Sequence, residues 1–308
     1  MSGIHHVTAI SGAATRNLDF HTRILGLRLV KKTVNFDDPG TYHLYYGDER
    51  GTPGSILTFF PWAHAAQGQL GSGETQETAF RVPTAALGYW THRFVEKSVP
   101  HQLEKRFGES VLSFSDPDGM HFALVGAPGA EREGAWSHDI PAEHAIRGFH
   151  GVTLVVGDAA PTAQVLTEVL GFREAARDGA LTRYQADATL GGHVDLREVG
   201  DFPRGKLGRG SVHHVAFRAA DDAAQAAMAQ TAVKLGRHVT EVKDRNYFRS
   251  VYFREPGGVL FEIATDDPGF AVDEPLASLG TALKLPRFLE PRRAELEAKL
   301  PPLTEAVA

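Results

Sequence analysis

An internal repeat limits the possible folds of this chain more than any other feature. The repeated unit is a β-rich segment, then a helical segment, then further β-rich segments. It occurs four times, and its copies begin with residues 3–10 (GIHHVTAI), 77–83 (ETAFRVP), 148–156 (GFHGVTLVV) and 211–217 (SVHHVAF). Such a unit cannot bury its hydrophobic face or enclose a pocket alone, so the units must pack on one another. The sequence therefore predicts an α+β fold of four βαβββ modules, paired into two domains with cup-shaped mixed sheets.

The length of 308 residues suits two domains of roughly 150 residues each. The polar stretch 128–145 is the expected linker between two halves of the chain. We predict an N-terminal half over residues 1–135 and a C-terminal half over 146–268, each with two modules, and a C-terminal tail over 269–308. A tail helix is expected at 291–300, where AELEAKL has helical spacing, and it should serve as a packing or subunit-contact element.

The fourth unit contains the first indication of a functional site. Residues 213–217 and 251–264 are rich in β-branched and aromatic side chains and predict strands, and the alanine-rich stretch 221–236 predicts a helix. Because side chains alternate along a strand, His214 should lie on the face opposite the apolar side chains that pack under the helix. The same alternation places Glu262 opposite the apolar set of its own strand.

A buried carboxylate in the sequence VLFEIA costs free energy unless a cation or a hydrogen-bond donor meets it. The expected partner of Glu262 is a metal ion that it shares with His214. The alternative is that Glu262 pairs with an arginine and that His214 is a hydrogen-bonded histidine of the core.

Comparison of the repeats shows which units keep these side chains. The positions that match His214 in the first three units are His6, Arg81 or a neighbour, and Gly151. The positions that match Glu262 are Thr58, Ala123 and Leu196. A single metal held by His6, His214 and Glu262 therefore requires the first and fourth units to share one cup, while the second and third units form a metal-free cup.

The ligand types limit the chemistry of this metal. The chain has no cysteine, which excludes thiolate ligands. Two imidazoles and one carboxylate, with Thr58 where a fourth ligand would stand, leave coordination positions open, and this set suits Fe(II) used with dioxygen. A second glutamate in place of Thr58 would instead suit a glyoxalase-type isomerase.

Composition and charge favour a small-molecule partner. The formal net charge of −6 argues against a general nucleic-acid or anionic-membrane surface. The chain contains no run of about 18 apolar residues, and its first residues lack the order of charges and apolar residues of a secretion signal. We therefore expect a cytoplasmic protein that binds neither nucleic acid nor membrane, and a homo-oligomer is compatible with the sequence.

With these residues in hand, the chain resembles the vicinal oxygen chelate superfamily, also called the glyoxalase/bleomycin-resistance/dioxygenase superfamily, over residues 3–265. Within it, the sequence is most similar to the ring-cleaving hydroquinone dioxygenases. The motifs that carry this resemblance are HHVT (5–8), LGLRLVKKTVNFDD (25–38), YHLYYGDERGTPGS (42–55), RGFH (147–150), HHVAF (213–217), DRNYFRSVYFREPGGVLFE (244–262) and LGTALKLP (279–286).

The resemblance implies an Fe(II)-dependent dioxygenase that opens the aromatic ring of substituted hydroquinones with O2, with Mn(II) as the other candidate metal. It implies His6, His214 and Glu262 as the ligands, in agreement with the strand-alternation argument for His214. It also indicates further residues that support the ligands or contact the substrate, namely His5, Thr8, His213, Arg245 and Tyr252.

Each of these further residues also has a plain structural interpretation. Arg245 could place its charge beside an aromatic ring or an oxyanion, or simply be solvated. Tyr252 could donate a hydrogen bond to a phenolate, or pack between strands. Alternation directs His5 and His213 away from the metal, although strand twist could reorient them. The remaining histidines that we expect to be structural or exposed include His21, His43, His121, His150 and His193.

Two other functions compete with ring cleavage. A metal-dependent isomerase or lyase of the glyoxalase type would use the same fold without consuming oxygen, and Thr58 in place of a carboxylate weighs against it. A non-catalytic binding or resistance protein would need an apolar cup but no metal ligands, so the presence of all three ligands weighs against that function.

Overall fold

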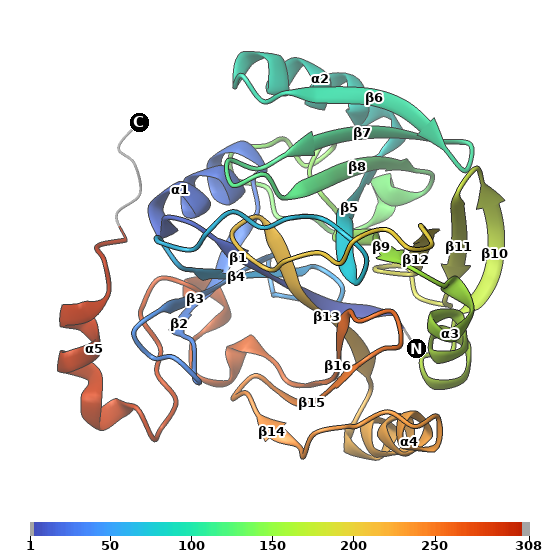
Figure 1. Ribbon diagram of the computed structural model, residues 1–308. Coiled ribbons are helices and arrows are strands. Elements are labelled where there is room, and N and C mark those ends of the chain that lie inside the picture. Colours follow the sequence, from blue (N-terminus) through green and yellow to red (C-terminus); the bar gives the residue numbers. More distant parts are fainter. Residues whose placement is uncertain (1–2, 304–308) are drawn as a thin grey trace.

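The computed structural model describes residues 3–303 and contains two mixed β-sheets of eight strands each (Figure 1). The strands of the first sheet are, in spatial order, β14 (Lys243–Asp244), β15 (Phe248–Arg254), β16 (Leu260–Pro268), β13 (Ser211–Ala219), β1 (Ile4–Ser11), β4 (Ile56–Pro61), β3 (Tyr42–Gly47) and β2 (Arg28–Val34). The strands of the second sheet are β10 (Arg173–Asp178), β11 (Leu181–Gln185), β12 (His193–Glu198), β9 (Phe149–Val156), β5 (Glu74–Pro83), β8 (His121–Ala127), β7 (Glu109–Ser115) and β6 (His101–Arg106).

Each sheet joins two of the four repeats through one antiparallel pair. Strand β1 pairs with β13 in the first sheet, and β5 pairs with β9 in the second. The first and fourth units therefore share one sheet and the second and third units share the other, as the sequence predicts. Each half of the chain, 1–135 and 146–268, contributes one unit to each sheet, and the division of the chain at the linker stays a prediction.

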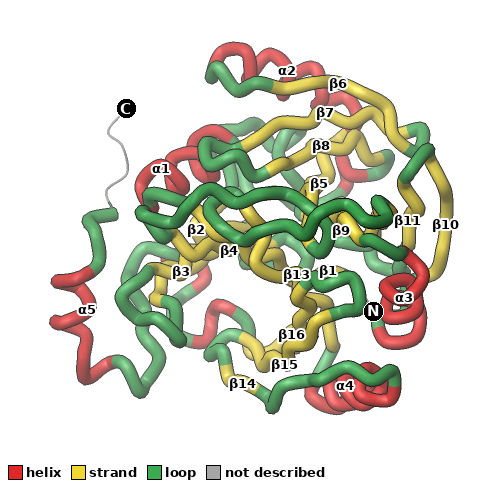
Figure 2. The backbone as a smooth tube through the Cα atoms, viewed as in Figure 1, coloured by secondary structure: helices red, strands yellow, loops and turns green. Residues whose placement is uncertain are grey.

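The helices lie on the outside of the strands, with α2 and α4 at opposite ends of the view (Figure 2). The helices are α1 (Ala14–Asp19), which continues as a π-helical turn over Phe20–Ile24, α2 (Leu87–Glu96), α3 (Ala159–Gln164), which continues over Val165–Val169, α4 (Asp222–Lys234) and α5 (Arg293–Lys299). Short 3₁₀ turns occupy Thr84–Ala86, Ala130–Arg132, Phe270–Val272, Leu276–Ser278 and Glu290–Arg292.

Local sequence explains where the expected helices begin and end. Helix α4 starts after Asp221, whose side chain accepts a hydrogen bond from the backbone N–H of Ala224, and Asp158 caps α3 in a similar way. Gly236 follows α4 with a φ of +76°, which a residue without Cβ adopts readily. The observed bounds of α4 and α5 lie within the expected ranges 221–236 and 291–300.

Three clusters of buried apolar residues stabilise the described part of the chain, and the smallest lies on the second sheet at Ala79, Val111, Ala123 and Val125. The largest one fills the space between the sheets and their covering helices. A smaller one lies inside the first cup and consists of Val30, Tyr45, Ile56, Ala216, Tyr247, Phe248, Ala264, Phe270 and Leu279. Phe270 and Leu279 come from the C-terminal tail, so the tail forms part of the first cup. The tail also follows the edge strand β2, where the N–H of Lys284 donates to the carbonyl of Lys32 over 2.9 Å.

Among the helices of the described residues, none is both long and apolar enough to cross a lipid bilayer.

Candidate metal centre

Three side chains from three neighbouring strands converge inside the first cup. His6 comes from β1, His214 from β13 and Glu262 from β16, and their potential ligand atoms all lie within 4.8 Å of one another. All three residues are buried. Within residues 3–303 they are the one group of three or more histidine and acidic side chains that converge in this way. The three residues that sequence reasoning selected therefore meet at one point.

The geometry at Glu262 fits a divalent cation. Its Oε2 is buried and has no hydrogen-bond partner, yet Nε2 of His6 lies 3.3 Å and Nε2 of His214 lies 2.9 Å from it. A buried anionic oxygen that faces two imidazole nitrogens needs a positive charge between them. Among the described residues, the ion pairs of Glu262 are with these two histidines and include no arginine or lysine. The alternative pairing with an arginine therefore finds no support.

Hydrogen bonds orient all three potential ligands. Ser250 donates its hydroxyl hydrogen to Oε1 of Glu262, which leaves Oε2 to face the histidines. Nδ1 of His6 lies 2.9 Å from Nδ1 of His5, and Nδ1 of His214 lies 2.8 Å from Nδ1 of His213. His6 and His214 each have their Nδ1 engaged and their Nε2 directed at the carboxylate. Such outer hydrogen bonds select the tautomer and orientation that a metal ligand needs.

The positions of His5 and His213 correct the expectation from strand alternation. The register between β1 and β13 skips one residue on each strand, His5 on β1 and His213 on β13. An extra residue on one strand forms a β-bulge, which interrupts the alternation and redirects its side chain. Each of these histidines therefore contacts the ring of its neighbour, at a centroid distance of 5.1 Å in both pairs, and does not point away from the ligands.

A cavity of about 450 Å³ opens beside His6 and His214. The exposed surface of its walls is mainly apolar, although polar and charged residues also line it. The aromatic and apolar lining residues are Phe36, Tyr45, Phe60, Trp62, Phe248, Tyr252 and Leu260. Its size and its mainly apolar surface, interrupted by polar groups, are typical of a small-molecule site.

Arg245 and Tyr252 line this cavity together. Nε of Arg245 donates to the hydroxyl of Tyr252 over 3.3 Å, and Nη2 of Arg245 lies 3.1 Å from Oδ2 of Asp37 at the rim. The ring of Tyr252 lies edge-on to His214, with a centroid distance of 5.7 Å. Both residues therefore face the cavity beside the potential ligands.

Thr8 lies behind the cavity and belongs to a chain of hydrogen bonds that sequence reasoning missed. Thr58 donates to the Oγ1 of Thr8 over 2.8 Å, and Nε2 of His43 lies 2.8 Å from the same Thr58 hydroxyl. Nδ1 of His43 lies 2.9 Å from the hydroxyl of Tyr45. His43, which we expected to be structural or exposed, thus lines the cavity. The alternation of His43 and Tyr45 in YHLYYG was the signal available in the sequence.

Burial sets the protonation states of these groups. Burial lowers the pKa of His214, although the Glu262 carboxylate opposes the shift, and burial with the neighbouring His214 lowers the pKa of His213 to about 3. Neutral imidazoles are the form that binds metals. Burial by itself would raise the pKa of Glu262, but His6 and His214 hold it well below its usual range, so the carboxylate is ionised.

The second sheet places different side chains at the equivalent positions. In the first sheet Thr8 pairs with Thr58, and Ala216 pairs with Glu262, which confirms Thr58 as the counterpart of Glu262. In the third unit Thr153 pairs with Asp195, so the counterpart there is Asp195, and the sequence comparison that chose Leu196 was wrong by one residue.

The residue of the second unit that corresponds to His6 and His214 also differs from the expectation. In the first sheet His6 pairs with Ala216, and His214 lies two residues before Ala216. In the second sheet Gly151 pairs with Ala79, and Glu77 lies two residues before Ala79. Glu77 therefore occupies this position, in place of Arg81. Glu77 pairs with Arg106 over 2.7 Å, and Asp195 pairs with Arg183 over 2.8 Å, so arginines meet the carboxylates of the second cup.

Comparison with known proteins agrees with this architecture. The profile of the Glyoxalase/Bleomycin resistance protein/Dioxygenase superfamily matches residues 148–263. The chain is 45% identical over 300 residues, covering 97% of this chain and 96% of the relative, to MhqO of Bacillus subtilis (strain 168), which is provisionally named a ring-cleaving dioxygenase. It is 35% identical over 308 residues, covering 96% and 95% of the two chains, to a chlorohydroquinone/hydroquinone 1,2-dioxygenase of Sphingobium indicum.

A solved structure supports the same relationship. The crystal structure of a provisionally assigned dioxygenase from Bacillus subtilis subsp. subtilis str. 168 superposes with a TM-score of 0.95 at 44% sequence identity and covers 99% of this chain and 98% of that one. The similarity therefore extends through both sheets and the tail. The repeats, the paired sheets and these relatives lead to one conclusion: the chain belongs to the glyoxalase/bleomycin resistance protein/dioxygenase superfamily.

Proposed function

We propose that this protein is an Fe(II)-dependent dioxygenase that opens the aromatic ring of hydroquinones with O2. The observation that carries the proposal is the buried set of two imidazoles and one carboxylate beside an aromatic-lined cavity of about 450 Å³. The names of the relatives support it, since one acts on chlorohydroquinone and hydroquinone and another is provisionally a ring-cleaving dioxygenase.

His6, His214 and Glu262 would hold the metal, with Fe(II) as the proposed ion and Mn(II) as the alternative. When bound, such a metal supplies the electronic coupling that ground-state dioxygen needs to react with an aromatic ring. Two neutral nitrogens and one carboxylate leave coordination positions for other molecules, which suits this use.

The cavity residues would bind and orient the substrate. Arg245 keeps its positive charge at any working pH and can stabilise the oxygen of an ionised hydroquinone. Burial raises the pKa of Tyr252, so its hydroxyl remains protonated and can donate to the same oxygen. The aromatic walls, including Phe248 and Phe60, would hold the ring and exclude water.

His213 would hold a proton at a defined atom. If His214 binds the metal through Nε2, its own proton is on Nδ1 and is donated to Nδ1 of His213, 2.8 Å away. The neutral His213 then carries its proton on Nε2. Because His213 lines the cavity, this N–H is a donor for a substrate hydroxyl. His5 would orient His6 in the same way, and Thr8 would hold Thr58 and His43 in place.

The two competing functions are less well supported. A glyoxalase-type isomerase would need a further ligand opposite Glu262, but Thr58 stands there and is engaged with Thr8 and His43. A pure binding protein would not need three converging buried ligands. A cytoplasmic location and a homo-oligomeric assembly stay predictions of the sequence.

The experiment that tests the function is oxygen uptake by the protein loaded anaerobically with Fe(II). Hydroquinone and dioxygen should disappear in equal amounts, and the reaction should stop when the iron is chelated. A parallel sample loaded with Mn(II) tests the choice of metal. Turnover of the same substrates under argon would instead establish an isomerase or lyase.

A further inference from the structure

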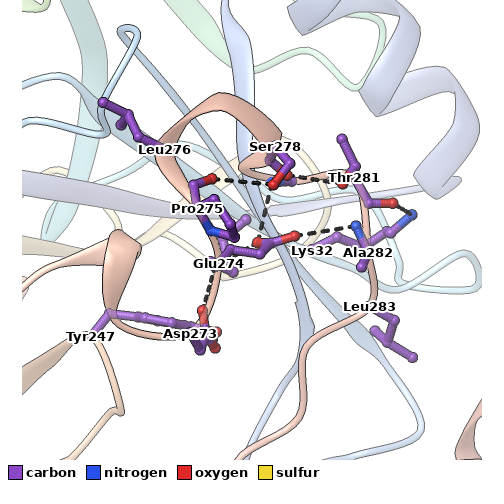
Figure 3. A network of polar contacts seen from close by, with 12 residues as sticks. Lys32, Tyr247, Asp273, Glu274, Pro275, Leu276, Ser278, Thr281, Ala282 and Leu283 are labelled. Atoms are coloured by element: carbon purple, nitrogen blue, oxygen red, sulfur yellow. Dashed lines mark hydrogen bonds and ion pairs between the residues drawn. The ribbon is translucent and has the colours of Figure 1, made fainter.

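A buried lysine connects the C-terminal tail to the first sheet. Lys31 on β2 has no exposed side-chain surface, and its Nζ donates to Oδ1 of Asp273 and to Oε2 of Glu274, each over 2.6 Å. A buried ammonium group is costly unless anionic partners compensate it, and here both partners come from the tail. The tail is therefore anchored at Asp273 and Glu274 (Figure 3).

Asp273 has a second set of contacts that Glu274 lacks. Its Oδ2 accepts a hydrogen bond from the hydroxyl of Tyr247 over 3.0 Å and another from Nδ2 of Asn246 over 3.4 Å. In Figure 3 the side chain of Tyr247 lies directly beside Asp273. Glu274 instead accepts from the backbone N–H groups of Gly280 and Ala282, which belong to the tail itself. Asp273 thus bridges the lysine and the turn that joins β14 to β15.

This turn has a conformation that needs support. Asn246 has a φ of +68°, in the left-handed region that residues with a Cβ seldom adopt. Its N–H donates to Oδ1 of Asp244 over 2.7 Å, and the N–H of Arg245 donates to the carbonyl of Phe248 over 3.0 Å. Asp273 holds the Asn246 side chain from outside the turn. These three hydrogen bonds therefore stabilise a backbone conformation that has an unfavourable free energy by itself.

Asn246 and Tyr247 both contact Asp273, and the residue on either side of this pair lines the cavity. Arg245 precedes Asn246 and donates to Tyr252, and Phe248 follows Tyr247 and lies 4.9 Å from the ring of His6. Any shift of the turn would move the charge of Arg245 and the wall formed by Phe248 together. The residues that the tail contacts are thus adjacent in sequence to two residues that line the cavity.

Tyr247 is the second point of attachment. Its side chain is 1% exposed, its ring packs on Phe270 of the tail at 5.0 Å, and its carbonyl accepts from the N–H of Gly269 over 2.9 Å. Burial raises the pKa of the Tyr247 hydroxyl, so it stays a hydrogen-bond donor to Asp273. The tail therefore holds this residue by its ring, its hydroxyl and its backbone.

We propose that Asp273 is a positioning residue of the active site, which, anchored on Lys31, holds the turn 244–248 so that Arg245 and Phe248 face the substrate. This inference rests on the proposed function for the identity of the substrate. The arrangement of the turn can be tested without it. The C-terminal tail then positions residues of the proposed hydroquinone site, in addition to packing against the first sheet.

The test compares Asp273→Asn with Glu274→Gln in the Fe(II)-loaded protein. Both changes remove one carboxylate charge from Lys31, but only Asp273 contacts the turn. One amide oxygen cannot serve both the lysine and the Tyr247 hydroxyl, so Asp273→Asn should loosen the turn and lower kcat/KM by about tenfold. Glu274→Gln should leave kcat/KM within about twofold of the wild type, because its other contacts stay within the tail. Tyr247→Phe, which removes only one hydrogen bond, should give a smaller loss in the same direction.

Two further measurements separate positioning from general stability. In an Arg245→Ala background the Asp273→Asn change should have a clearly smaller effect on kcat/KM, because one of the two groups that Asp273 positions is already absent. Hydrogen exchange of residues 244–249 should be faster in Asp273→Asn than in Glu274→Gln. Equal effects of the two variants, or unchanged exchange in this segment, would overturn the proposal. A wild-type protein that does not cleave hydroquinones would overturn the proposed function instead, and the exchange comparison would still decide the role of Asp273.

Discussion

Glu262 and Asp195 occupy equivalent strand positions, but the groups that surround their buried carboxylates differ. Each is a buried carboxylate that must be compensated. Asp195 receives two hydrogen bonds from Arg183, at 2.8 and 2.9 Å, and its charge is neutralised within the protein. Glu262 receives one from Ser250, and its second oxygen faces two imidazoles. This difference between the two neighbourhoods distinguishes the first cup as the candidate metal site.

Glu262→Gln tests this difference, because it keeps the shape of the side chain and removes its charge. We expect the variant to fold, to lose most of its iron and to lose ring cleavage, since the site loses its anionic ligand. The measurements are metal content after gel filtration, oxygen uptake and thermal unfolding. The control is Asp195→Asn, which should retain iron and lose stability. A Glu262→Gln protein that binds iron as the wild type does would remove Glu262 from the ligand set.

At the scale of strands, one β-bulge recurs in every repeat. The register between β1 and β13 skips His5 and His213, and the register between β5 and β9 skips Gln76 and His150. A bulge directs two successive side chains toward the same region. In the first sheet this places two histidine pairs beside one another. In the second sheet His150 instead lies 3.0 Å from Glu109 and stacks on His193.

The first residue of β5 provides a test of how the strands respond to pH. Glu74 is 9% exposed, and burial raises its pKa from 4.5 to about 7. The folded state therefore binds more protons than the unfolded state across this interval, and the free energy of unfolding falls as the pH rises through it. Glu74→Gln removes the titrating group. The variant should gain about 1–3 kcal/mol relative to the wild type between pH 5 and pH 8.

Urea unfolding at the two pH values measures this gain. The exposed Glu143 offers the control, and Glu143→Gln should change the free energy of unfolding little, because a surface substitution loses few contacts. A Glu74→Gln variant whose stability relative to the wild type is the same at both pH values would show that Glu74 is better solvated than its burial indicates.

At the scale of the whole molecule, two sheets of the same topology carry different chemistry. The first sheet encloses the candidate metal centre and its cavity, and the C-terminal tail packs into its cup. The second sheet holds a network in which Arg183 meets Asp195 and Glu109, and Arg106 meets Glu77. The candidate ligands are thus confined to the first cup, and the second cup has buried ion pairs at the equivalent positions.

Arg183→Met measures how strongly the second cup supports the fold. It leaves Asp195 and Glu109 without their cation, and breaking a buried pair in this way costs about 3–5 kcal/mol. The matched control is Arg177→Met on the neighbouring strand, where solvent screens the exposed pair with Glu174, so this variant should unfold close to the wild type. Denaturant unfolding gives both values. Iron content per folded chain should stay unchanged in both variants, and a loss of iron in Arg183→Met would show that the two cups are coupled.

Local patterns in the sequence were sufficient for the repeats, the sheet composition and the three converging residues. Repeat units that cannot close a core alone must pair, and ligand residues on the first and fourth units require those two to share a sheet. Alternation then separates the apolar face from the face that bears His214 and Glu262. These inferences succeed because each depends on side-chain type and strand periodicity, which a sequence displays directly.

Other features of the site depend on how distant strands pair, and only the tertiary structure decided them. A one-residue skip in register redirects His5 and His213, and no local pattern reveals which residue of a strand is unpaired. His43 joins the cavity because β3 pairs with β4 beside Thr58. Lys31 meets Asp273 across 242 residues of sequence, so its burial follows from the path of the tail. The chain specifies which side chains can do chemistry, and the pairing of its strands specifies which of them meet, because contact between distant segments is a property of the packed whole.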